Sequence, residues 1–124
     1  MKAGELKEYL AAALNTDVRL MGDPEKEVSR LGMCSGAGSS EWEACVRLGA
    51  QAFLSGEIKH HLALAMADAG IPCFECGHFA TEQPGIFALA DALQSGLNQV
   101  QYRLDIFKSK AGAYASVSGP GQAV

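Results

Sequence analysis

Short apolar runs alternate with amphipathic helical segments along most of this chain, and this alternation limits its fold more than any other feature. Apolar residues at helical spacing predict helices over residues 5–14, 40–49, 60–69 and 81–93. Apolar runs that end at glycine or turn residues predict strands over residues 18–21, 28–34, 50–54, 71–76 and 100–107. This order predicts an α/β fold, a three-layer αβα sandwich around a largely parallel or mixed sheet. We expect one domain over residues 1–107 and a loose tail of small residues over 108–124.

Two of the predicted helices carry capping signals at their first residues. Ser40, followed by Glu43 three residues later, has the spacing of a capping box. Thr81 is suited to cap the helix that follows it, and Pro84 would then lie in the first turn, where proline is tolerated. The sequence thus predicts that a helix begins at each of these hydroxyl side chains.

The charge and cysteine content of the chain exclude several classes of function. The 124 residues carry 14 acidic and 10 basic side chains, a net charge of -4, and no basic stripe that would displace counterions from nucleic acid. We therefore expect a small polar substrate or a protein partner rather than general nucleic-acid binding.

No apolar run approaches the roughly 18 residues of a membrane span, and the charged opening segment lacks the apolar centre of a signal peptide. Four cysteines in such a chain predict free thiols and a cytoplasmic protein.

Polar loops follow three of the predicted strands, over residues 35–40, 56–61 and 77–82. Sites in open α/β sheets collect at the carboxyl ends of strands, so these loops are the expected place for function. In the third loop, His78 and Glu82 are four residues apart, about one helical turn, so that both side chains can bind one divalent metal ion. A structural role fits this spacing equally well, with Glu82 favouring the positive helix end and His78 bonding a backbone group.

The remaining motifs are less specific. His60 and His61 are adjacent in the second loop, and on a helix they would point about 100° apart, so that only one would face a shared centre. The first loop, residues 35–40, has half of a phosphate-binding fingerprint, but the third glycine is absent and a plain tight turn is the better interpretation. Cys73 and Cys76 have the spacing of a zinc or redox pair. Residues three apart in a strand face opposite sides, which favours buried thiols instead.

Three motifs in order give the chain a family resemblance: CSGAG after a strand, then LSGEIKHH, then IPCFECGHFATEQPG. Over about residues 1–107 they resemble the C-terminal half of the NIF-three-like family, also called GTP cyclohydrolase 1 type 2 homologues. Members of that family are similar in having a dinuclear metal centre in a cleft between two α/β halves and commonly form toroidal hexamers. The resemblance implies that His78 and Glu82 are metal ligands. It also implies that a histidine pair and an aspartate come from an N-terminal half, in cis or in trans, for which this sequence has no counterpart.

Within the second and third motifs, the chain departs from the family pattern at two positions. Glu57 stands where the family usually has aspartate, and Gln83 stands where arginine is often found. His61 matches the histidine of the second motif, whereas His60 is incidental. The resemblance implies that His61 and Glu57 line the cleft as catalytic or proton-transfer groups, and that the loop over residues 35–40 lies near a phosphate.

The function that this resemblance implies is that of a metal-binding, hydrolase-like half of a dinuclear centre. Divalent ions, whether zinc, manganese, iron or magnesium, would lower the pKa of a bridging water and present hydroxide to a small polar or nucleotide substrate. The alternative is a non-enzymatic metal-binding or regulatory oligomerisation module, which the incomplete ligand set favours for this chain. A third, lesser hypothesis is nucleotide binding without metal.

Overall fold

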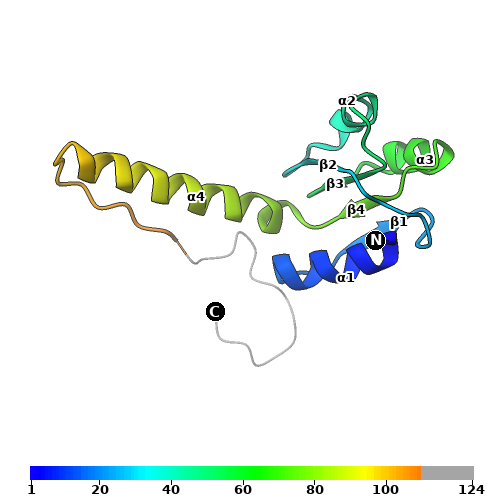
Figure 1. Ribbon diagram of the computed structural model, residues 1–124, viewed down its shortest axis with the longest axis horizontal. Coiled ribbons are helices and arrows are strands. Elements are labelled where there is room, and N and C mark those ends of the chain that lie inside the picture. Colours follow the sequence, from blue (N-terminus) through cyan, green and yellow to red (C-terminus); the bar gives the residue numbers. More distant parts are fainter. Residues whose placement is uncertain (110–124) are drawn as a thin grey trace. The chain divides into compact units, whose positions relative to one another are not determined.

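The computed structural model describes residues 1–109, which divide into two compact units that meet between Gly85 and Ile86 (Figure 1). The elements in chain order are α1 (Ala3–Leu14), β1 (Arg19–Met21), β2 (Leu31–Cys34), the 3₁₀ turn η1 (Ser39–Glu41), α2 (Trp42–Arg47), β3 (Ala52–Ser55), α3 (His60–Asp68), β4 (Cys73–Glu75) and α4 (His78–Gln99). All four strands belong to the first unit. The last helix, α4, begins in the first unit and continues into the second.

The first unit is built on a four-stranded mixed sheet with the strand order β1-β4-β3-β2. The two connections from β2 to β3 and from β3 to β4 follow the βαβ pattern, so β2, β3 and β4 are parallel, with Leu31 beside Ala52 and Phe53 beside Cys73. The edge strand β1 is antiparallel to β4, with Arg19 beside Glu75. The predicted α/β sheet is thus confirmed in its mixed form.

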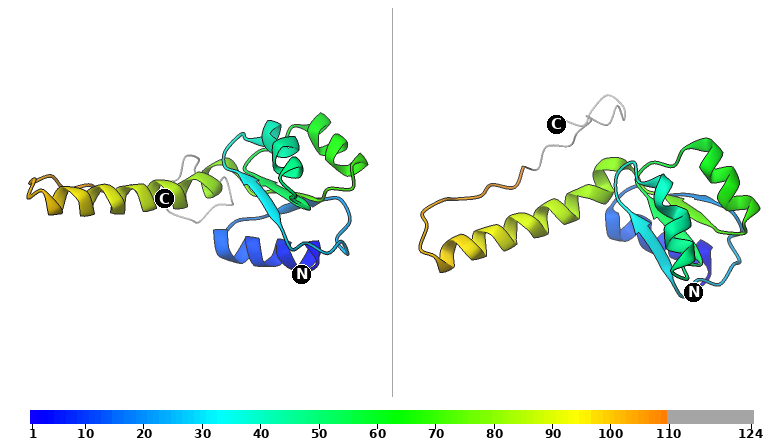
Figure 2. Two further views of the ribbon diagram at one scale, coloured as in Figure 1. Left: turned by 45° about the horizontal axis from the view of Figure 1, so that its top comes forward. Right: turned by 90° about the horizontal axis from the view of Figure 1, so that it is seen from above.

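Helices cover both faces of this sheet (Figure 2). On one face, Leu54 and Phe74 pack in a cluster with Leu10 of α1. On the other face, Phe53 packs with Met66 of α3 and with residues of α2. Neighbouring strand residues therefore enter opposite cores, as the two-residue period of a strand requires. The predicted three-layer αβα sandwich is confirmed.

The expected capping box at the start of α2 is wrong. A 3₁₀ turn, Ser39–Glu41, precedes the α-helix, which begins at Trp42 without a side-chain cap. The Ser40 hydroxyl lies 3.3 Å from the Glu41 carboxylate and so does not bind a helix amide. Ser40 lies inside the 3₁₀ turn and Glu41 is the N-cap residue of α2, so Ser40 is not placed to cap the α-helix.

The expected start of α4 at Thr81 is also wrong, because the helix begins at His78. Gly77 has φ +85°, and this left-handed conformation turns the chain from β4 directly into the helix. Thr81 therefore lies in the first turn, where its hydroxyl is 3.0 Å from the carbonyl oxygens of Gly77 and His78. Pro84 falls inside the helix, where it removes one backbone hydrogen bond. The boundary between the two units follows at Gly85.

The strand expected over residues 100–107 is absent from the described chain, which has no helix or strand after Gln99. In the second unit, the Gln94 side chain donates to the Leu104 carbonyl at 3.0 Å and accepts the Ile106 amide at 2.8 Å. Lys108 pairs with Asp91 of α4. The segment is therefore held by helix side chains, which satisfy backbone groups that a neighbouring strand would otherwise bind.

The predicted tail of small residues falls almost entirely on residues 110–124, outside the described part of the chain. Within residues 1–109, no helix has both the length and the apolar character needed to cross a membrane.

Candidate functional site

The three polar loops meet at the carboxyl ends of β2, β3 and β4, and hydrogen bonds join them. The Gly36 carbonyl accepts the Ser55 hydroxyl at 3.1 Å and the Glu57 amide at 2.9 Å. The Gly36 amide in turn donates to the Thr81 hydroxyl oxygen at 3.0 Å. One residue of the first loop thus binds both of the others, and the predicted convergence of the loops holds in the structure.

Two glycines allow this close approach of the loops. Gly36 has φ +62°, and a Cβ at this position would lie 2.5 Å from Glu82 Oε1 and 3.1 Å from His78 Nε2. A Cβ on Gly56 would lie 2.7 Å from the Gly36 carbonyl oxygen and 2.8 Å from His78 Cα. Both distances on Gly56 are to backbone atoms, which cannot move aside without separating the loops. The glycine at 36 therefore leaves room for the functional side chains, and the glycine at 56 allows the backbones to touch.

His78 lies between two carboxylates, one from the loop after β3 and one from its own helix, α4. Its Nδ1 is 2.9 Å from Glu57 Oε1, and its Nε2 is 3.1 Å from Glu82 Oε1, one helical turn along α4. The hydrogen bond to Glu57, with a smaller contribution from the charge of Glu82, raises the pKa of His78 above its ordinary value of 6.5. All three side chains are partly open to solvent, with 42% of the His78 side chain exposed.

The spacing of His78 and Glu82 fits a shared metal ion. Zinc bonds of about 2.0–2.1 Å to nitrogen and oxygen at a tetrahedral angle place the two donor atoms about 3.3 Å apart, and the observed separation is 3.1 Å. Because Glu57 binds Nδ1, the ring presents Nε2 toward Glu82, as a ligand would. In the described residues, however, no group of three or more histidine, cysteine, aspartate or glutamate side chains is arranged to hold a metal ion. His78 and Glu82 are therefore spaced as two ligands of one metal ion, and no third ligand joins them within residues 1–109.

The comparison with known proteins agrees with the sequence motifs. Residues 1–113 match the Duf34/NIF3 family, described as NGG1p interacting factor 3. The chain belongs to this family. It is 33% identical over 90 residues to the GTP cyclohydrolase 1 type 2 homolog of Escherichia coli strain K12, an alignment that covers 72% of this chain and 36% of that protein. The homolog of Yersinia pestis is 31% identical over 107 residues, which cover 86% of this chain and 41% of that protein.

Solved structures share the fold of this chain. A Bacillus cereus protein related to NIF3 superposes with a TM-score of 0.84 at 19% identity, over 100% of this chain and 33% of the other. The Staphylococcus aureus protein SA1388 gives a TM-score of 0.82 at 24% identity, over 100% of this chain and 40% of the other. The chain therefore spans only about two fifths of the length of the relatives that it matches.

The structure does not bring every predicted residue of this Duf34/NIF3 chain into the site. Glu57, His78 and Glu82 are together, but His60 and His61 lie exposed in the first turn of α3 and take no part in the hydrogen bonds that join the loops. The catalytic role predicted for His61 stays a prediction. Thr81, which the sequence predicts to be a helix cap, instead accepts the Gly36 amide and so joins the third motif to the first loop.

The Cys73 and Cys76 thiols are free and lie in different cores of the sandwich. Burial, with a smaller contribution from the charge of Glu75, raises the pKa of each thiol to about 11. At neutral pH both sulfurs are therefore protonated, and they are poor nucleophiles and poor metal ligands. The preference for buried thiols over a zinc or redox pair is supported by this placement.

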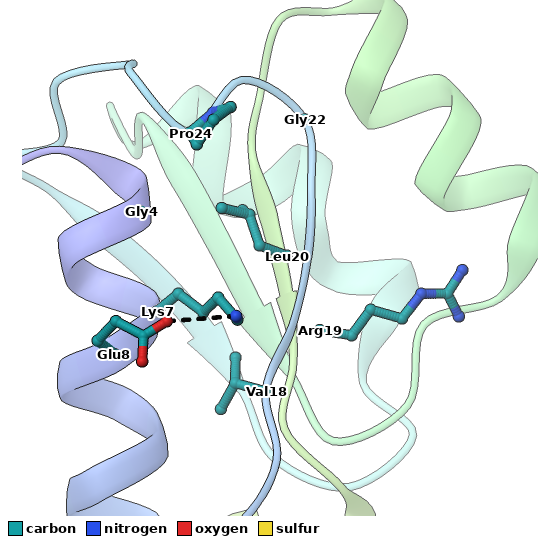
Figure 3. Close-up of a pocket in the computed structure, with 8 residues that line it drawn as sticks. All are labelled: Gly4, Lys7, Glu8, Val18, Arg19, Leu20, Gly22 and Pro24. Atoms are coloured by element: carbon teal, nitrogen blue, oxygen red, sulfur yellow. Dashed lines mark hydrogen bonds and ion pairs between the residues drawn. The ribbon is translucent and has the colours of Figure 1, made fainter.

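A separate groove lies between α1 and β1 (Figure 3). Its lining consists of Gly4, Lys7, Glu8, Val18, Arg19, Leu20, Gly22 and Pro24. Lys7 and Glu8 form an ion pair with each other at 3.3 Å. None of the predicted site residues lines this groove.

Proposed function

We propose that His78 and Glu82 are two ligands of a divalent metal ion, and that this chain supplies one half of the metal centre of a hydrolase-like protein. The observation that carries the proposal is the separation of 3.1 Å between His78 Nε2 and Glu82 Oε1, with Glu57 bound to the opposite ring nitrogen. Metal-ligating histidines commonly donate their second ring N–H to a carboxylate in this way. The candidate ions are zinc, manganese, iron and magnesium.

Each residue of the site has a defined part in this proposal. Glu57 Oε1 accepts the Nδ1 proton of His78, so that Nε2 is the ring nitrogen that would bind the ion once the ion displaces any proton there. Glu82 adds a negative charge that offsets the charge of the ion, and Gly36 leaves open the space beside both donors. A bound divalent ion would act as a Lewis acid toward water or a substrate oxygen.

The remaining ligands would come from outside the described residues. Structural zinc sites have four protein ligands and catalytic ones commonly three, whereas residues 1–109 bring two together. The relatives named GTP cyclohydrolase 1 type 2 homolog are longer than this chain. We propose that the rest of the centre comes from an N-terminal half in cis or in trans, within a homo-oligomer such as a hexamer, and that the substrate is a small polar molecule or a nucleotide. The four free thiols favour a reducing compartment such as the cytoplasm.

A second candidate function is a non-enzymatic metal-binding or regulatory module. The lack of a third ligand among residues 1–109 favours it for the chain alone. Under this alternative the same two residues bind an ion, but the protein contributes an oligomer surface and performs no hydrolysis.

Calorimetric titration of the purified chain with Zn²⁺ or Mn²⁺ tests both proposals. We expect the wild-type chain to bind the ion and His78→Ala and Glu82→Gln to lose this binding. His60→Ala also removes an exposed imidazole and serves as the matched control, with binding unchanged. Equal binding by His78→Ala would contradict the metal assignment. Tight binding of two ions per chain would contradict the module alternative and justify assays of hydrolysis, including hydrolysis of GTP.

A further inference from the structure

Three successive backbone amides in the loop after β3 donate hydrogen bonds to three different parts of the first unit. The Glu57 amide donates to the Gly36 carbonyl at 2.9 Å, and the Ile58 amide donates to Glu75 Oε2 at 2.9 Å. The next amide along the chain donates to the Ser39 hydroxyl at 3.4 Å. The backbone that carries Glu57 is therefore fixed at the residue itself and at both positions that follow it.

Glu75 is the charged acceptor among these three. It ends β4 and lies beside Ser55, the last residue of β3, so its carboxylate is next to the loop that follows. A hydrogen bond to an ionised acceptor is roughly twice as strong as one between neutral groups, and only 29% of this side chain is exposed. Its other partner, Arg19, is 3.9 Å away and 66% exposed, a pairing that contributes little. The bond to the Ile58 amide is thus the main interaction of the Glu75 carboxylate.

We propose that Glu75 is a positioning residue for the candidate metal ligands. Its carboxylate holds the Ile58 amide, which fixes the backbone of Glu57, and the Glu57 carboxylate in turn orients the His78 ring. Glu75 acts through these contacts and does not touch the ion or the substrate. The inference rests on the proposed function for the role of His78, but the series of hydrogen bonds needs no metal to form.

The experiment compares four variants of the full chain with the wild type. Glu75→Ala removes the acceptor, and Glu75→Asp keeps the charge but is one methylene too short to reach. Glu75→Gln keeps an acceptor oxygen without the charge, and Arg19→Gln removes only the ion pair. Circular dichroism verifies that each variant is folded. The measurements are amide hydrogen exchange at Ile58 and the ¹⁵N shifts of the His78 ring without metal, followed by Zn²⁺ affinity from calorimetry.

We expect Glu75→Ala and Glu75→Asp to exchange the Ile58 amide faster, to change the Nδ1 shift of His78 and to weaken Zn²⁺ binding about tenfold, the low end of the effect of residues that orient metal ligands. Glu75→Gln should show smaller changes in the same direction, because its neutral oxygen accepts a weaker hydrogen bond, and Arg19→Gln should keep values close to wild type. Unchanged exchange and ring shifts in Glu75→Ala would overturn the inference, and so would equal losses in Arg19→Gln. If the shifts follow the expected order but the wild type binds no Zn²⁺, the positioning role stands and the proposed function fails.

Discussion

Replacing Gly36 with alanine should separate the stability of the fold from the ability to bind metal. The left-handed φ of +62° at this position costs an alanine about 1–2 kcal/mol, and the stiffer unfolded chain returns about 0.4–1 kcal/mol of that. The new Cβ would lie 2.5 Å from Glu82 Oε1. This atom is the end of a flexible side chain that is 49% exposed, so it can move away at small cost to folding. We therefore expect a loss of about 1 kcal/mol in the free energy of unfolding.

The effect of Gly36→Ala on metal binding should be larger than its effect on folding. Moving Glu82 away removes one of the two proposed ligands, and the same Cβ would lie 3.1 Å from the other proposed donor, His78 Nε2. We expect Zn²⁺ affinity to fall at least about tenfold, which corresponds to about 1.4 kcal/mol of binding free energy. Urea denaturation gives the stability, and calorimetric titration gives the affinity on the same preparation.

Gly70 provides a matched control for this substitution. Its φ is +66°, but the nearest atom to a Cβ there is Lys26 Nζ at 4.0 Å. Gly70→Ala should therefore show the same backbone strain and a similar loss of stability, with wild-type affinity for Zn²⁺. Wild-type affinity in Gly36→Ala, or an equal loss of affinity in Gly70→Ala, would refute the placement of the ion beside residue 36.

Three further predictions follow from the hydrogen bonds and the pKa shifts. Thr81→Val removes the acceptor of a partly buried loop amide and should lower the free energy of unfolding by about 1–2 kcal/mol in urea denaturation; a neutral result would mean that the loops do not depend on this bond. The Cys73 and Cys76 thiols have pKa values of about 11 in the folded chain and an ordinary value of 9.0. Their contribution to the free energy of unfolding is therefore complete below pH 9 and is lost as the pH rises toward 11. The loss is on the order of 2 kcal/mol for each thiol. Denaturation curves between pH 8 and pH 11 measure this loss, and Cys73→Ala should reduce it. The pKa of His78 is raised, so the protonated ring stabilises the fold fully below the ordinary pKa of 6.5 and loses this effect as the pH rises through the raised pKa. NMR titration of the His78 ring should give a pKa above 6.5. A pKa at or below 6.5 would contradict the bond to Glu57.

The sequence was sufficient to predict the sandwich because the signals for its layers are local. Successive residues of β3 are apolar, as expected for a parallel strand that is buried on both faces of a sheet. Phe53 and Leu54 accordingly pack into different cores. The closeness of His78 and Glu82 was also predictable, since their four-residue spacing places them on one side of a helix that begins at His78.

Residues that act through long-range contacts were not predictable in the same way. The hydroxyl of Thr81 resembles a helix cap in sequence, but its main long-range partner is the amide of Gly36, 45 residues earlier in the chain. The alternation over residues 100–107 is typical of a strand with one wet face, yet a strand also needs a neighbour to bind its backbone. Gln94 meets part of that need from α4, and nothing in the local pattern of the segment indicates this side chain as its partner.

The number of ligands in the candidate site sets what the chain is expected to do alone. His78 and Glu82 match the donor spacing of one ion, and Glu57 already holds the ring in the orientation that binding needs. The contacts that order these candidate ligands therefore need no ion or partner to form. An added chain would need to bring only its own ligands, because preorganised donors avoid the entropic cost of arranging flexible side chains at the moment of binding. Under the proposed function, we therefore expect weak binding of an ion by this chain and tight binding by an assembly that supplies the remaining ligands.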